Sequence, residues 1–302
     1  MQTTNRVLRW SHAVVACLLA ATTVSAQGGF GPRDVDALPS SAPTVVAQYG
    51  THALAFGELR IPSGTGPFPV AVVIHGGCWT VGFATLKNTA PLASALTDVG
   101  VATWNIEYRQ VGDPGAGWPG TFLDVGAGVD YLRILAEKYP IDLARVALVG
   151  HSAGAHLALW SAGRSVLPKE SPVRGPNPLP VAAAVAIDGP ADVGGLVGRD
   201  AQICGKPVIA PFMGGTPAEQ PARYHDGSPQ EMLPLRVPQF LVAAAVLTQE
   251  DAQRHQARGR SAGDSVTVLP ITNGNHFDVI GPGRPAFPAV LSFIRQAMGL
   301  ER

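Results

Sequence analysis

Apolar positions along this 302-residue chain follow two alternating patterns. Short continuous apolar runs, typical of strands covered on both faces, are separated by longer segments in which apolar residues recur at helical spacing. The runs predict strands at 44–49, 54–61, 70–75, 101–106, 145–149, 181–187, 238–246 and 266–269. The helical spacing predicts helices at 86–99, 122–139, 155–162, 249–262 and 285–298. This alternation predicts an α/β fold with a doubly wound, mostly parallel sheet and helices on both faces.

The first 26 residues have the pattern of a secretory signal peptide. Arg6 and Arg9 precede an apolar stretch over 13–24, which ends in the small residues Val24-Ser25-Ala26. The stretch is short for a bilayer span, so we expect cleavage near Ala26 and no stable membrane anchor. An uncleaved anchor is the alternative. The expected location is therefore secreted or periplasmic.

The remainder predicts one domain with an irregular insertion. Residues 27–43 are rich in Gly, Pro and Ser and predict a flexible N-terminal arm, while 44–302 form the domain. Residues 188–235 have poor periodicity and several turn signals. A long irregular segment at such a place often roofs a site.

Charge and cysteine content narrow the function classes. The formal net charge is zero and only 15% of residues are charged, which argues against a nucleic-acid partner. Removal of the leader would leave Cys78 and Cys204, which can form a disulfide in an exported protein. Two free thiols are the alternative.

One predicted strand runs directly into a glycine-flanked serine. The apolar run 146–149 leads into Gly150-His151-Ser152-Ala153-Gly154, and a helix-forming run follows. This is the context that a nucleophile elbow needs, because the glycines leave room for its tight turn. The same spacing surrounds Ser261, but there a charged helix precedes it and a strand follows, which predicts an ordinary helix end. Context therefore selects Ser152 as the candidate nucleophile.

Two other predicted strand ends carry candidate partners for Ser152, which needs a base and a pocket for an oxyanion. His276 lies in a Gly/Asn turn after the last predicted strand. His75-Gly76-Gly77-Cys78 follows the strand at 70–75, and the backbone N–H groups of Gly77, Cys78 and Ala153 are candidates for the oxyanion pocket. A plain tight turn is the alternative for the glycine pair.

These motifs resemble those of a known family. His75-Gly-Gly-Cys-Trp79, Gly150-His-Ser-Ala-Gly154 and Asn275-His-Phe-Asp278 are similar to α/β-hydrolase serine esterases, most closely to secreted bacterial feruloyl and acetyl esterases and prolyl-oligopeptidase-type domains. The resemblance covers about residues 44–300. It implies a Ser–His–acid triad with Ser152 as nucleophile and His276 as base, and neither metal nor organic cofactor.

The acid is where the chain departs from the family pattern. That family usually carries an Asp in a His-Gly-x-x-Asp loop after the strand corresponding to 240–246, and this loop lacks both features. Glu250 and Asp251 are the nearest carboxylates and are the predicted acids. The competing interpretation makes them the acidic first turn of the next helix. Asp188 and Asp192, which follow the strand at 181–187, are the second choice.

The predicted function is hydrolysis of small or medium carboxylic esters through an acyl-enzyme. An amide hydrolase is the first alternative, since the motifs around Ser152 and His75 also resemble kynurenine formamidase and the wider group includes peptidases. The second alternative is a non-catalytic binding protein of the same fold, because the usual acid loop is altered.

Overall fold

An eight-stranded sheet in the order β1-β2-β4-β3-β5-β6-β7-β8 runs through the protein. The computed structural model describes residues 29–300, so the predicted signal peptide lies outside the described residues. The strands are β1 (Val45–Gln48), β2 (Phe56–Arg60), β3 (Phe68–Ile74), β4 (Ala102–Ile106), β5 (Ile141–His151), β6 (Ala183–Ile187), β7 (Gln239–Ala243) and β8 (Val266–Pro270). β2 pairs antiparallel with both β1 and β4, whereas all pairs along the order β4-β3-β5-β6-β7-β8 are parallel.

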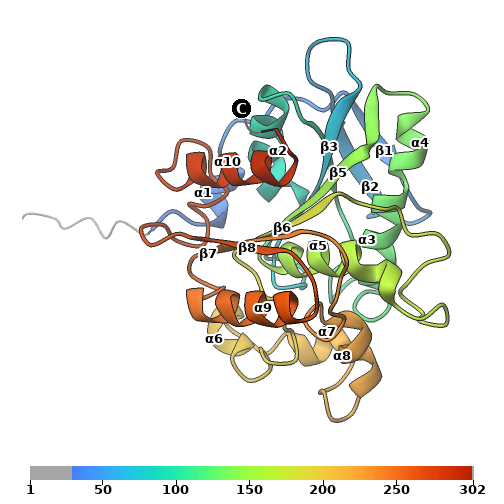
Figure 1. Cartoon of the computed structure of the whole chain (residues 1–302), viewed down its shortest axis with the longest axis vertical. Coiled ribbons are helices and arrows are strands. Elements are labelled where there is room, and N and C mark those ends of the chain that lie inside the picture. The colour runs from blue at the N-terminus through green and yellow to red at the C-terminus, as the bar shows by residue number, and fades with distance from the viewer. Residues whose placement is uncertain (1–28, 301–302) are drawn as a thin grey trace, which may run out of the picture.

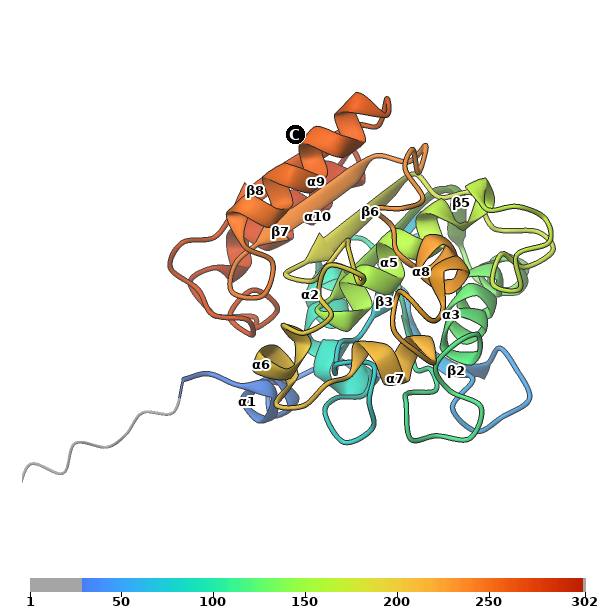
Figure 2. The same cartoon turned by 90° about the horizontal axis from the view of Figure 1, so that it is seen from below.

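Helices cover both faces of this sheet (Figures 1 and 2). They are α1 (Pro32–Asp36), α2 (Ala90–Asp98), α3 (Gly120–Asp130), α4 (Leu132–Ala136), α5 (Ala153–Gly163), α6 (Asp200–Cys204), α7 (Ile209–Met213), α8 (Pro221–Gly227), α9 (Gln249–Ser261) and α10 (Phe287–Ala297). Two 3₁₀ helices, η1 (Leu86–Thr89) and η2 (Arg164–Val166), precede α2 and follow α5. The predicted doubly wound α/β fold is confirmed.

Strand β3 shows how the sheet builds two cores. Val70, Val72 and Ile74 belong to the core under α3 and α5, while Ala71 and Val73 belong to the core under α2 and α10. Successive side chains of a strand point to opposite faces, so a strand covered on both sides must be apolar throughout. The continuous apolar runs in the sequence follow from this double coverage.

Three segments differ from the sequence prediction. The helix expected at 122–139 is divided into α3 and α4 at Tyr131. The insertion 188–235 contains three short helices, α6 to α8, rather than irregular chain alone. The described part of 27–43 is docked rather than flexible, because Val35 of α1 is fully buried and the Asn88 side chain bonds Pro32 and Asp36.

The parallel strands bring the candidate residues to one edge of the sheet. Gly76–Trp79 follow β3, Ser152 follows β5, Asp188 follows β6 and His276 follows β8. Since β3, β5, β6, β7 and β8 are successive parallel neighbours, all these strands end on the same side.

Candidate active site

Ser152 stands at a sharp turn between β5 and α5. Its backbone has φ 57° and ψ −120°, a strained conformation for a residue other than glycine. A Cβ at Gly150 would lie 1.9 Å from the Gly154 carbonyl oxygen, and one at Gly154 would lie 2.1 Å from the Ile74 carbonyl oxygen. Only glycine fits at either position, so the glycine pair permits the turn that lifts Ser152 out of the strand.

The Asp188 carboxylate lies beside the His276 ring. The His276 Nδ1 lies 2.7 Å from Asp188 Oδ2, and the carboxylate is fully buried. Burial alone would raise the pKa of Asp188, but the hydrogen bond and the charge of His276, with backbone N–H groups, hold it below its usual value. Asp188 thus stays ionised beside the imidazole and fixes Nδ1 as the protonated nitrogen, which leaves Nε2 free to act as a base.

The loop after β7 forms a cradle for the Asp188 carboxylate. Four successive backbone N–H groups, those of residues 244–247, donate to its two oxygens at 2.8–3.2 Å. In the resembling family this loop carries the acid itself. Here it binds an acid that follows β6 instead.

Glu250 and Asp251, the predicted acids, are not brought to His276. Both lie in the first turn of α9 and pair with Arg254, and Asp251 also lies 3.6 Å from Arg199. The Asp251 N–H donates to the Thr248 hydroxyl that caps the helix. Their positions are explained by helix capping and by the helix dipole. Asp192 is also turned away, since its oxygens accept from Gly195 N–H and the Gln230 amide.

The glycine loop after β3 lies against Ser152. A Cβ at Gly76 would stand 2.8 Å from Ser152 Cβ, and the following Gly77 and Cys78 have φ of 107° and 51°. Ala153 is the first residue of α5, where N–H groups have no partner within the helix. The predicted oxyanion donors, Gly77, Cys78 and Ala153, therefore lie next to Ser152 on two segments, the loop after β3 and the start of α5.

A cavity of about 470 Å³ joins these groups. Ser152, His276, Gly77 and Cys78 line it, and most of the remaining wall is apolar, namely Pro32, Phe83, Ala84, Ile203, Ala245, Val246 and Phe277. Phe83 and Ile203 are 40% and 38% exposed. The space beside the serine therefore suits an uncharged apolar group.

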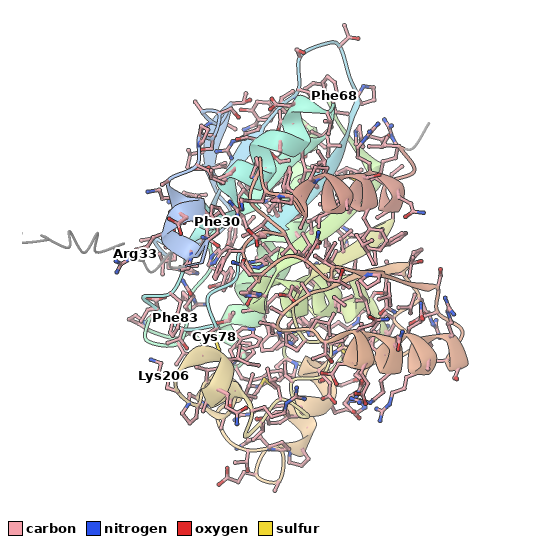
Figure 3. The ribbon with its side chains drawn as sticks, turned by 90° about the vertical axis from the view of Figure 1, so that its left-hand side faces the viewer. Phe30, Arg33, Phe68, Cys78, Phe83 and Lys206 are labelled. Carbon is pink, nitrogen blue, oxygen red and sulfur yellow. A yellow bond between two sulfur atoms is a disulfide. The ribbon has the colours of Figure 1, made fainter. Side chains whose placement is uncertain are left out.

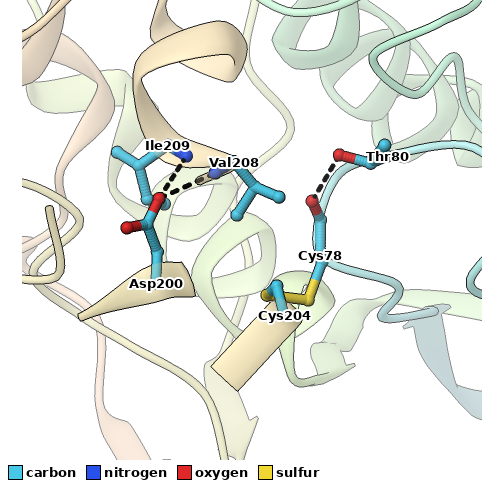
Figure 4. Close-up of a disulfide and its surroundings, with 6 residues drawn as sticks. All are labelled: Cys78, Thr80, Asp200, Cys204, Val208 and Ile209. Carbon is cyan, nitrogen blue, oxygen red and sulfur yellow. Dashed lines mark hydrogen bonds between the residues drawn. A yellow bond between two sulfur atoms is a disulfide. The ribbon is translucent and has the colours of Figure 1, made fainter. Parts of the chain in front are cut away.

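A disulfide connects this cavity to the insertion (Figure 4). Cys78 and Cys204 are bridged across 126 residues of sequence, with Cα atoms 6.1 Å apart, so of the two alternatives that the sequence leaves open the structure has the disulfide. Cys204 ends α6 and is adjacent to Ile203, which lines the cavity. Figure 3 shows Cys78 beside Phe83 and Lys206, and the Lys206 ammonium lies 5.7 Å from the Phe83 ring centroid.

Comparison with known proteins identifies the family. The family model described as BD-FAE matches residues 59–270. The chain belongs to the BD-FAE family.

Individual relatives of this BD-FAE chain are distant. Esterase LipC of Mycobacterium tuberculosis is 28% identical over 249 residues, covering 77% of this chain and 59% of LipC. The probable carboxylic ester hydrolase LipM of the same organism is 29% identical over 239 residues, covering 75% of this chain and 53% of LipM. The chain thus spans a little over half the length of these curated relatives. The solved structure of Esterase B from Lactobacillus rhamnosis has a TM-score of 0.73 at 18% identity, with 89% and 90% of the two chains covered, and shows the shared α/β-hydrolase fold.

His151 of the BD-FAE chain also lines the cavity and contacts His276, which its place in the motif around Ser152 does not indicate. Its Nε2 lies 2.8 Å from the His276 carbonyl oxygen, and the two rings are 4.4 Å apart. Burial and the charge of His276 lower the pKa of His151 to about 3, so it is neutral and donates through Nε2. This contact joins residues 125 positions apart, so it depends on the fold.

Two kinds of feature are absent from the described residues 29–300. No group of three or more His, Cys, Asp or Glu side chains there is arranged to hold a metal ion. No helix in that range is long and apolar enough to cross a membrane.

Proposed function

We propose that this protein is a serine esterase that hydrolyses small or medium carboxylic esters. The observation that carries the proposal is the 2.7 Å pair of His276 and buried Asp188, in a cavity that His276 shares with the strained Ser152. The names of LipC and LipM, an esterase and a probable carboxylic ester hydrolase, agree with this chemistry. The Asp188 contact also supplies the acid whose absence after β7 favoured a non-catalytic protein.

The reaction we infer follows from these positions. His276 takes the Ser152 proton as the hydroxyl oxygen attacks the ester carbonyl, and buried Asp188 stabilises the imidazolium that forms. The N–H groups of Ala153 and of the Gly77–Cys78 segment stabilise the oxyanion. His276 then gives its proton to the departing alcohol. A water molecule next attacks the acyl-enzyme while His276 takes its proton, and His276 returns that proton to the Ser152 oxygen as the carboxylic acid leaves.

We also propose that the protein is exported and that its leader is cleaved near Ala26. The leader pattern and the disulfide support this, since disulfides persist in oxidising compartments. Intact-mass measurement of protein expressed from the full sequence should show loss of about residues 1–26. A mature protein that keeps its first residues would contradict the proposal.

Covalent labelling with a fluorophosphonate and a panel of nitrophenyl esters tests the activity. Wild type should be labelled and should hydrolyse the esters, while Ser152→Ala should lose both. Ser261→Ala is the matched control, because Ser261 occupies the same five-residue pattern at the end of α9 and should behave like wild type. Labelling with hydrolysis of N-formylkynurenine but not of esters would favour the amidase. Absence of Ser152-dependent labelling would contradict any serine hydrolase.

A further inference from the structure

A second cavity, of about 270 Å³, lies between α9 and the chain that follows β6. It shares only Val246 with the lining of the catalytic cavity, and it differs in chemistry. Its polar lining includes Asp192, Arg199, Asp251, Arg254, His255 and Arg258, and its apolar lining includes Leu196 and Leu247. Small-molecule sites typically measure roughly 300–1,000 Å³, so this space, slightly below that range, suits only a small molecule.

One arginine of this cavity has no carboxylate partner. Arg254 bonds Asp251 and Glu250, and Arg199 lies 3.6 Å from Asp251. Within residues 29–300, the Arg258 side chain forms neither an ion pair nor a hydrogen bond. An unpaired guanidinium beside a cavity is a binding group for an anion, above all for a carboxylate, whose two oxygens match its donor geometry.

His255 provides a second, independent indication of a ligand. Its Nε2 lies 2.7 Å from Gln239 Oε1, and the Gln239 amide nitrogen donates to Asp264. The amide oxygen must therefore accept from His255 Nε2–H, which leaves Nδ1 as a hydrogen-bond acceptor. The residue is 1% exposed, and Nδ1 has no partner among the described residues. A buried acceptor without a donor costs free energy, so we expect a hydroxyl group or a water molecule to donate to this nitrogen.

Different side chains of the cavity lining thus have opposite requirements. His255 Nδ1 and the Asp192 carboxylate accept hydrogen bonds, whereas Arg258 favours negative charge. Burial, the largest effect, lowers the pKa of His255 to about 4, so the ring is a neutral acceptor at neutral pH. A small molecule that satisfies both groups therefore carries a hydroxyl donor and a negative charge.

We infer that this cavity binds a small hydroxylated carboxylate, with its carboxylate on Arg258 and a hydroxyl donating to His255 Nδ1. The site is separate from the serine centre and does not depend on the proposed esterase activity. Its occupant would contact Val246 and Leu247, whose N–H groups hold Asp188.

Binding to the full-length mature protein can be measured by calorimetry with three probes of one ring size. D-Glucuronate carries both a carboxylate and hydroxyls, D-glucose carries hydroxyls only, and cyclohexanecarboxylate carries the charge only. Glucuronate should bind saturably, and each of the other two should bind at least about tenfold more weakly, as expected for loss of a charge-assisted or buried hydrogen bond. Arg258→Gln should weaken glucuronate binding by about tenfold or more.

Arg260→Gln is the matched control, since it removes the same charge from the same helix outside the cavity lining. An equal loss in both variants would overturn the site, as would the absence of saturable glucuronate binding or equal binding of glucose. The ¹⁵N resonance of His255 Nδ1, assigned by its loss in His255→Gln, should shift with glucuronate but not with cyclohexanecarboxylate. An unmoved resonance on glucuronate binding would overturn the hydroxyl contact. All readouts are binding measurements, so they stand or fall independently of ester turnover.

Discussion

At the scale of single residues, the proposed nucleophile and acid both have backbone conformations that most side chains avoid. Ser152 has φ 57° and Asp188 has φ 49°. Each is held there by a neighbouring strand, because the Ser152 N–H donates to Ile187 and the Asp188 N–H donates to Val242, both at 2.9 Å. Such strain persists only where the surroundings fix it, and it is concentrated at functional sites.

The acid was the residue that the sequence located least well. Ser152 and His276 could be predicted because each follows a strand in a recognisable turn. Asp188 also follows a strand, but the groups that single it out are the backbone N–H groups of 244–247, a run of Ala, Val and Leu. Backbone N–H donors cannot be inferred from the identity of the side chains. The sequence therefore favours Glu250 and Asp251, the nearest carboxylates after the strand that became β7.

The contact of His151 with the His276 carbonyl leads to a prediction at the same scale. His151→Leu removes the donor and should lower kcat for a nitrophenyl ester by about 3–10-fold, the equivalent of one hydrogen bond, with a smaller change in KM. His151→Gln keeps an N–H donor of similar reach and should recover most of the loss. Equal kcat in wild type and the leucine variant would show that His151 does not position the base.

At the scale of elements, the short helix α6 is held from two directions. Its last residue, Cys204, is joined to Cys78 of the glycine loop, and its first, Asp200, accepts the N–H groups of Val208 and Ile209 at 2.7 and 2.9 Å. The sequence predicted an irregular insertion here, because helices of five residues are too short to show periodicity. The two cysteines beyond the predicted leader allow a bridge, but they do not show that it joins the insertion to the glycine loop after β3.

Removal of this bridge should affect both stability and catalysis. We expect Cys204→Ala to lose about 2–5 kcal/mol of unfolding free energy, because the closed loop is long. Turnover should fall by up to about 10²-fold, the effect of losing one oxyanion donor, since Cys78 would no longer be held. Urea unfolding and ester kinetics measure the two effects, and wild type treated with reductant should behave alike. If Cys204→Ala is destabilised but keeps wild-type kinetics, the bridge has a structural role only.

At the scale of the whole molecule, a buried hydrogen bond between His75 and Glu107 joins the ends of the neighbouring strands β3 and β4. His75 Nε2 lies 2.7 Å from Glu107 Oε1, and the carboxylate also accepts the N–H groups of Leu86 and Tyr108. Burial alone would raise the pKa of Glu107, but His75 and the backbone donors lower it. A depressed folded-state pKa stabilises the protein above the unfolded value, near pH 4.3, and that stabilisation is lost as the pH falls through the folded value.

Glu107→Gln should therefore destabilise the protein in a pH-dependent way. At pH 7 we expect a loss of about 1–3 kcal/mol in the free energy of unfolding, because the amide cannot satisfy all three donors. The difference from wild type should shrink as the pH falls below about 4.3, where the unfolded-state carboxylate takes up protons, and should be lost through the lower folded-state pKa. Glu250→Gln, whose side chain is 84% exposed, is the control and should match wild type. A difference independent of pH in urea titrations would contradict the ionised role of Glu107.

The catalytic arrangement itself is tested most directly by comparing ester turnover in Asp188→Asn and Asp251→Asn. Both changes replace one carboxylate oxygen by an amide nitrogen, but only the first affects the partner of His276. Asp188→Asn should lower kcat by about 10³–10⁴-fold, because the amide no longer fixes the imidazole or stabilises its charge. Asp251→Asn should stay within about twofold of wild type, because its partly exposed pair with Arg254 does not contact His276. Full activity in Asp188→Asn, or a large loss confined to Asp251→Asn, would contradict a Ser152–His276–Asp188 centre.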